Sequence, residues 1–160
     1  MTAPESSPQF LARADGLRLA YRHRPGQGPT IIFLPGYMSD MEGSKALALD
    51  AWAAEQGRAM LRLDYAGCGA SEGRFEDGTL ASWRDDALAL IDGLTQGPLL
   101  LVGSSMGGWL ALLIALARPD RIMGLVGIAA APDFTQWGFS DADKALLATE
   151  EVSVDVTEGA

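Results

Sequence analysis

The sequence is poor in the residues that cross-link small proteins or bind metals. Among its 160 residues it has one cysteine, Cys68, and one histidine, His23. A single cysteine excludes an internal disulfide, and one cysteine with one histidine cannot make a zinc site. We therefore expect neither a metal nor another cofactor. The scarcity of cysteine also fits a reducing compartment, and we expect a cytoplasmic location.

Positive charge is scarce as well. Lysine and arginine number 12 against 21 aspartates and glutamates, which gives a formal net charge of −9. Nucleic acids and anionic membrane surfaces attract clustered basic residues, so we expect neither as the main partner. Hydrophobic residues make up 48% of the chain and charged residues 21%, as in a globular domain with a core, and this composition favours no particular oligomeric state.

One apolar run is long enough to be tested as a membrane span. Residues 99–117 carry no charge, and a spanning helix needs about 20 apolar residues. The sequence GSSMGG interrupts this run, however, which favours a strand, a tight turn and a buried helix. The N-terminal sequence MTAPESSPQF lacks the basic region and apolar run of a secretory signal. We therefore expect neither a span nor a signal.

Short apolar runs alternate with amphipathic segments along the chain. The predicted strands cover residues 17–22, 30–34, 59–64, 99–102 and 122–128, and the predicted helices cover residues 45–56, 80–94, 105–117 and 133–148. The first strand alternates like an edge strand, whereas the others are apolar throughout, like strands buried on both faces. Ser44 is the predicted N-cap of the first helix, and Gly57 follows its end. This order predicts an α/β fold, a doubly wound and mostly parallel sheet.

The sequence GSSMG fits the G-x-S-x-G pattern, with Ser105 as its middle serine. It directly follows the strand LLLV and opens the helix WLALLIALA, as a nucleophile turn requires. The serine of such a turn has a strained backbone and an exposed hydroxyl, and crowding by the adjacent strands and helix requires Gly103 and Gly107. We predict Ser105 as a nucleophile, with the backbone N–H groups of Met106 and of Tyr37 in the PGYMSD loop as oxyanion donors.

Other interpretations of the glycine-rich turns are weaker. GCGASEG misses the dinucleotide pattern G-x-G-x-x-G, because Glu72 stands at the third glycine. GSSMGG lacks the Lys-Ser/Thr pair of a P-loop. A turn shaped only for packing a helix on a sheet remains an alternative for GSSMGG.

Four segments occur in order across residues 30–134: IIFLPGYMSDMEGSKALAL, LRLDYAGCGASEG, LLLVGSSMGGWLALLIALARPDRI and VGIAAAPDF. Together they resemble the α/β-hydrolase superfamily, and more narrowly the abhydrolase branch that includes mitochondrial acyl-protein thioesterases (depalmitoylases), also known as acyl-glucuronide esterases. The resemblance implies an ester or thioester substrate and the roles given above for Ser105, Tyr37 and Met106. It implies a structural role for the turn that begins at Asp64.

The same resemblance places the acid and the histidine of the triad on loops after the last strands. His23 precedes the first buried strand, so we expect it to be structural. Asp133, Asp141 and Asp143 are expected to be solvated charges near the start of a helix rather than the triad acid.

We therefore expect a hydrolase fold truncated before its last strands. Residues 1–9 would be a loose tail, residues 10–131 the N-terminal part of the core domain, and residues 132–160 the start of a lid and an irregular tail. The aromatic residues Phe134, Trp137 and Phe139 would form either an apolar lid wall or a simple helix contact.

Two functions fit these expectations. The first is a serine hydrolase that forms an acyl-enzyme at Ser105. Its turnover would be impaired by about a million-fold, because the triad histidine and acid are absent. The second is a catalytically inactive hydrolase-fold fragment or binding protein.

Overall fold

The computed structural model describes residues 7–132, 140–142 and 145. The strands are β1 (Gln9–Ala12), β2 (Arg18–Arg24), β3 (Gln27–Leu34), β4 (Arg58–Leu63), β5 (Leu99–Ser104) and β6 (Ile122–Ile128). The α-helices are α1 (Ser44–Gln56), α2 (Leu80–Leu94) and α3 (Met106–Ala117), and the short 3-10 helices are η1 (Phe75–Asp77) and η2 (Pro119–Arg121). The helix expected at 133–148, and with it Phe134, Trp137 and Phe139, lies almost entirely outside the described residues.

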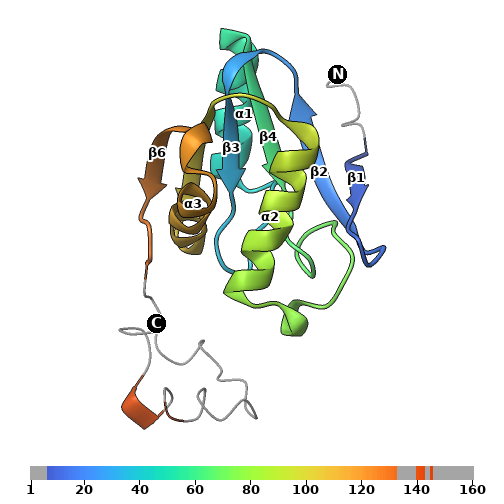
Figure 1. The fold of residues 1–160 in the computed structure, drawn as a ribbon, viewed down its shortest axis with the longest axis vertical. Coiled ribbons are helices and arrows are strands. Elements are labelled where there is room, and N and C mark those ends of the chain that lie inside the picture. The colour runs from blue at the N-terminus through green and yellow to red at the C-terminus, as the bar shows by residue number, and fades with distance from the viewer. Residues whose placement is uncertain (1–6, 133–139, 143–144, 146–160) are drawn as a thin grey trace.

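The strands form one mixed sheet in the order β1-β2-β4-β3-β5-β6 (Figure 1). The four strands from β4 to β6 are parallel to one another, whereas β1 and β2 pair in antiparallel fashion. The expected α/β architecture with a mostly parallel sheet is therefore confirmed. One strand was missed, because β1 is only four residues long and mostly exposed. Since β1 pairs with β2, the expectation that β2 lies at the edge is wrong. The expectation that residues 122–128 are buried on both faces is also wrong, because β6 lies at the other edge and Met123 and Val126 are 69% and 47% exposed.

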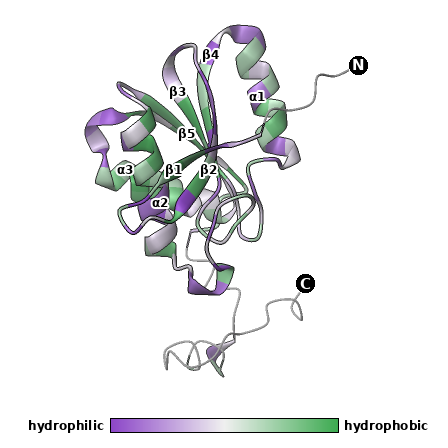
Figure 2. Cartoon of the chain, turned by 90° about the vertical axis from the view of Figure 1, so that its right-hand side faces the viewer, coloured by the Kyte–Doolittle hydropathy of each residue, from purple (hydrophilic) through white to green (hydrophobic). Residues whose placement is uncertain are grey.

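Helices cover both faces of the sheet, with α1 on one side and α2 and α3 on the other (Figure 2). Successive side chains of a strand point to opposite faces, so each strand serves both layers. In β3, Ile32 and Leu34 pack with α2 and α3, whereas Ile31 and Phe33 pack with α1. This alternation explains why the central strands are apolar throughout.

The ends of α1 show one wrong prediction and one confirmed prediction. The N-cap is Gly43 rather than Ser44, which already lies in the helix. Gly57 ends the helix in the left-handed conformation, as expected, and its N–H donates to the carbonyls of Ala53 and Ala54.

The uncharged run at 99–117 divides into β5 and α3, as expected. Over the residues that the structure describes, no helix has the length and apolarity needed to cross a membrane. β3 and β5 lie side by side, and Leu34 at the end of β3 pairs with Gly103 near the end of β5. The segments that follow these two strands therefore meet at one edge of the sheet.

Candidate active site

Ser105 lies on the turn between β5 and α3 and is exposed. Its backbone angles, φ 54° and ψ −119°, are rare and strained for a residue with a side chain. Backbone hydrogen bonds hold this conformation. The Ser105 N–H donates to the Ile128 carbonyl at 3.0 Å, and the Ser105 carbonyl accepts from the N–H groups of Gly108 at 2.9 Å and Ala131 at 3.0 Å. The end of β6 thus supports the strained turn.

Three glycines leave no room for side chains in this turn, which we call the elbow (residues 103–108). A Cβ atom on Gly103 would lie 2.2 Å from the Gly107 carbonyl oxygen, and one on Gly107 would lie 2.0 Å from the Leu34 carbonyl oxygen. Gly108 was not singled out from the sequence. A Cβ atom there would lie 2.5 Å from the Ala130 Cβ atom, a contact that depends on the chain beyond β6.

The β3–α1 loop (residues 35–43) lies directly against the elbow. A Cβ atom on Gly36 would lie 3.1 Å from the Ser104 carbonyl oxygen and 3.3 Å from the Ser105 Cβ atom. The next residue is Tyr37, whose ring packs edge-on against Phe75 of η1 at a centroid distance of 5.3 Å. The structure therefore places Tyr37 in a loop that touches the elbow.

A cavity of about 360 Å³ opens beside Ser105. It lies between the β3–α1 loop, the start of α1 and the end of β5, and its lining includes Tyr37, Ser39, Lys45 and Ser104. Such a space can admit a small group next to the Ser105 side chain. Met106, at the other side of the turn, is the first residue of α3, and the first N–H groups of a helix have no acceptor within the helix.

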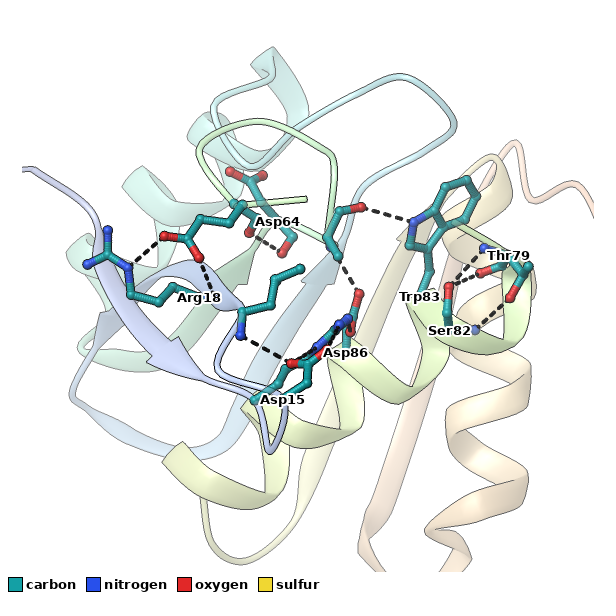
Figure 3. Close-up of polar contacts among 12 residues, drawn as sticks. Asp15, Arg18, Asp64, Thr79, Ser82, Trp83 and Asp86 are labelled. Atoms are coloured by element: carbon teal, nitrogen blue, oxygen red, sulfur yellow. Dashed lines mark hydrogen bonds and ion pairs between the residues drawn. The ribbon is translucent and has the colours of Figure 1, made fainter. Parts of the chain in front are cut away.

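The turn that follows β4 is bound by side chains of α2. Trp83 and Asp86 of α2 both bind the backbone of Ala66, Trp83 by donating its ring N–H to the carbonyl at 3.2 Å and Asp86 by accepting the N–H at 2.9 Å (Figure 3). Cys68 lies in the same turn and is buried, and burial together with the nearby Asp64 raises the pKa of its thiol to about 11. A thiol with this pKa stays protonated near neutral pH and is a poor nucleophile.

The structure keeps His23 away from Ser105. His23 is exposed on β2 and pairs with Leu61 of β4. Both β4 and β3 lie between β2 and β5, which amounts to about 14 Å across the sheet at a strand spacing of about 4.8 Å. Among the carboxylates expected to be solvated, Asp141 is exposed, whereas Asp133 and Asp143 are outside the described residues. In the described part of the chain, no group of three or more His, Cys, Asp or Glu could hold a metal ion.

Comparisons with known proteins agree with this geometry. The model of the family described as serine aminopeptidase, S33 matches residues 28–152. The palmitoyl-protein thioesterase ABHD10, mitochondrial, of Homo sapiens is 49% identical over 129 residues, which cover 81% of this chain and 42% of that protein. The chain thus spans less than half the length of this curated relative.

Solved structures give the same result. The mouse alpha/beta hydrolase domain-containing protein 10 superposes with a TM-score of 0.84 at 38% identity, covering 94% of this chain and 62% of the other. A putative hydrolase from Agrobacterium vitis S4 superposes with a TM-score of 0.78 at 41% identity, covering 93% and 64%.

One expectation is overturned by these relatives. The ABHD10 proteins are mitochondrial, so the cytoplasmic location expected from composition is wrong. A low cysteine count indicates only a reducing surrounding and does not distinguish one such compartment from another.

The resemblance seen in the sequence is confirmed by the family match and by the superposition on mouse ABHD10. The sheet order, the covering helices and the strained turn after β5 are those of an α/β-hydrolase core, of which the structure describes a part. The chain belongs to the serine aminopeptidase S33 family of α/β-hydrolases, in the branch that contains ABHD10.

Proposed function

We propose that Ser105 is the nucleophile of a serine hydrolase that cleaves carboxylic esters or thioesters. The observation that carries this proposal is the strained, exposed Ser105 on a turn packed against the β3–α1 loop. The Ser105 hydroxyl oxygen would attack the acyl carbonyl carbon, and the alcohol or thiol would leave with a proton. Water would then attack the resulting acyl-enzyme, releasing the acid and restoring the serine.

The oxyanion formed by this attack needs hydrogen-bond donors. We assign them to the backbone N–H groups of Met106 and Tyr37, the first at the N-terminal end of α3 and the second in the β3–α1 loop. The positive end of the α3 dipole adds to the stabilisation. Removing one such donor typically costs about 3–4 kcal/mol of transition-state stabilisation.

The general base is the missing part of this mechanism. The chain has one histidine, His23, which lies three strands from Ser105. His23 is therefore not the base of the proposed mechanism. Without a base beside Ser105 the chain should turn over substrate about a million-fold more slowly than a serine hydrolase with a complete triad.

The proposed substrate is an acyl thioester or ester. The human relative is named a palmitoyl-protein thioesterase. In this chain Tyr37 and Met38 expose 40% and 73% of their surface in the β3–α1 loop, next to the elbow. Exposed apolar side chains beside a nucleophile suit an acyl group better than a charged one.

Labelling with a fluorophosphonate, with imidazole added as an external base, tests the proposal. Imidazole should accelerate labelling of the wild-type chain, because it supplies the proton acceptor that no nearby histidine supplies. Ser105→Ala should abolish labelling, as read by intact mass. Ser104→Ala is the matched control, since Ser104 precedes the nucleophile and lines the same cavity, and it should still be labelled. Equal labelling of Ser105→Ala would refute the assignment.

A non-catalytic member of the fold that binds a partner or small molecule is the second candidate. The distance of His23 from Ser105 favours it, because the one histidine of the sequence lies three strands from Ser105. It predicts no labelling of Ser105 with or without imidazole, and no turnover of p-nitrophenyl esters.

A further inference from the structure

Three residues around the end of β4 bind the β3–α1 loop, and they lie outside the motifs of the nucleophile site. We propose that Arg62, Asp64 and Tyr65 are positioning residues that hold this loop so that the Tyr37 N–H faces the oxyanion formed at Ser105. This inference rests on the proposed function. We refer to the three residues as the loop clamp.

The loop clamp binds the backbone on both sides of Tyr37. On one side, the Tyr65 hydroxyl donates to the Pro35 carbonyl at 2.8 Å. On the other side, the Met41 N–H donates to Asp64 Oδ1 at 2.8 Å, and Arg62 Nη1 donates to the Met41 carbonyl at 2.7 Å. The backbone positions before and after Tyr37 are thus fixed from β4 and the residues that follow it.

These hydrogen bonds are shielded from water. Tyr65 is fully buried, and Asp64, Arg62 and Met41 are 2%, 5% and 1% exposed. Water cannot compete for buried donors and acceptors, so each bond is stronger than at the surface and costly to break. Burial also raises the pKa of Asp64, against the two N–H groups that stabilise its charge.

The Asp64 carboxylate has little freedom to move. Its second oxygen, Oδ2, accepts the Ala70 N–H at 3.0 Å. A Cβ atom on Gly69 would lie 2.2 Å from the same oxygen, so the turn after β4 closes tightly over the carboxylate. Asparagine has one acceptor oxygen, and its amide group would turn a donor toward one of the two N–H groups.

The loop clamp also contacts the helices. The Arg62 guanidinium pairs with Glu42 at 3.3 Å and with Asp50 of α1 at 3.5 Å. The Tyr65 ring lies 6.2 Å from the Trp83 ring of α2, centroid to centroid. The residues that bind the loop therefore also contact the helices on both faces of the sheet.

Asp86 offers a matched control for a merely structural role. It is a carboxylate of the same burial, 2% exposed, and it also accepts a backbone N–H, from Ala66 at 2.9 Å. It pairs with Arg13 at 2.9 Å. Both of these partners, Ala66 and Arg13, lie outside the β3–α1 loop.

The test compares Tyr65→Phe and Asp64→Asn with Asp86→Asn in the full chain, by two measurements. The first is hydrogen exchange of the backbone amides in residues 35–43. The second is the rate at which a fluorophosphonate labels Ser105 in imidazole. Both loop-clamp variants should speed exchange in the loop by about tenfold and slow labelling by about tenfold, because the donor is displaced. Asp86→Asn should leave the exchange rate in residues 35–43 and the labelling rate of Ser105 within about twofold of the wild-type values.

The exchange and labelling rates together distinguish a positioning role from a merely structural one. Unchanged exchange in the loop of Tyr65→Phe would overturn the inference, and this variant keeps the buried ring even if Asp64→Asn does not fold. Faster exchange with unchanged labelling would overturn the positioning role, as would equal effects in Asp86→Asn. If the wild-type chain is not labelled at all, the proposed function fails and the catalytic role with it. The exchange measurement would still show whether the three residues hold the loop.

Discussion

Two segments meet at Ser105, the elbow and the β3–α1 loop, and they are fixed by different means. The elbow is fixed by backbone packing, since Cβ atoms on Gly103 and Gly107 would lie 2.2 Å and 2.0 Å from carbonyl oxygens. The loop is fixed by side chains from elsewhere in the fold, Arg62, Asp64 and Tyr65. A position fixed by backbone contact excludes any larger residue. A position fixed by side-chain hydrogen bonds depends on their chemistry and charge.

This difference separates two kinds of sensitivity. The elbow should be intolerant of added atoms and insensitive to pH, because no titratable side chain holds it in the described structure. The loop should tolerate some added atoms and respond to pH, because Asp64 and the charged pairs of Arg62 support it. The predictions below test these sensitivities separately.

Gly107→Ala should have the largest effect. Its Cβ atom would lie 2.0 Å from the Leu34 carbonyl oxygen, and Leu34 cannot move away without breaking its pairing with Gly103 of β5. We expect the free energy of unfolding to fall by at least about 3 kcal/mol, measured by urea denaturation. Gly93→Ala is the control. A Cβ atom there meets only the Leu11 side chain at 3.4 Å, and alanine in a helix should stabilise by about 0.5–1 kcal/mol. A small decrease in the free energy of unfolding of Gly107→Ala would show that the elbow is not fixed by packing.

Gly36→Ala should separate activity from stability. The new Cβ atom would lie 3.1 Å from the Ser104 carbonyl oxygen and 3.3 Å from the Ser105 Cβ atom, so loop and elbow must part by a few tenths of an ångström. We expect imidazole-assisted labelling of Ser105 to slow by about tenfold, because a displaced donor stabilises the oxyanion less. The free energy of unfolding should fall by only about 1 kcal/mol. Labelling at the wild-type rate would show that the loop need not touch the elbow.

The sequence predicted the elements that depend on local signals. The helix at 80–94 and the strand at 122–128 have the predicted bounds, because periodicity and flanking turns define them. The strand–turn–helix context also placed Ser105 on the turn between β5 and α3, since that turn is short and contiguous in the chain. Such local patterns were enough for the α/β fold and for the position of the candidate nucleophile.

Features that depend on distant segments were not predicted. The loop clamp joins Tyr65 to Pro35, which becomes possible only because β4 and β3 are neighbours in the sheet. The sequence marked the turn after β4 as structural without showing what it holds. Gly108 was missed for the same reason, because its close contact, Ala130, follows a strand that is distant in sequence.

Acid should loosen the loop before it loosens the elbow. Burial raises the pKa of Asp64, and the nearby carboxylates of Asp40 and Glu42 raise it further, while the Cys68 thiol beside it stays neutral. The pKa of Asp64 in the folded chain lies above its unfolded value of about 3.8. The folded chain therefore binds a proton at Asp64 while the pH is still above 3.8. Protonation therefore favours the folded chain as a whole, yet it weakens the acceptor that binds the Met41 N–H.

The measurement is the protection of backbone amides, corrected for their intrinsic exchange rates, between pH 7 and pH 4. Protection should fall by a few-fold in residues 35–43 and stay constant in residues 103–108. Asp64→Asn should reduce the pH dependence of protection in residues 35–43. An equal fall in both segments would mean that acid opens the site as a unit.

Gly43→Ser should have the smallest effect and the opposite sign. Gly43 is the N-cap of α1, with an extended backbone (φ −64°, ψ 159°) and no side chain to accept an N–H of the first turn. A Cβ atom there would lie 3.4 Å from the Asp40 carbonyl oxygen, an ordinary contact. Serine should therefore stabilise by a few tenths of a kcal/mol, measured by urea denaturation, whereas Gly43→Ala should not. If the free energy of unfolding of Gly43→Ser fell by more than about 1 kcal/mol, the loop, like the elbow, would depend on a glycine rather than on the side chains that bind it.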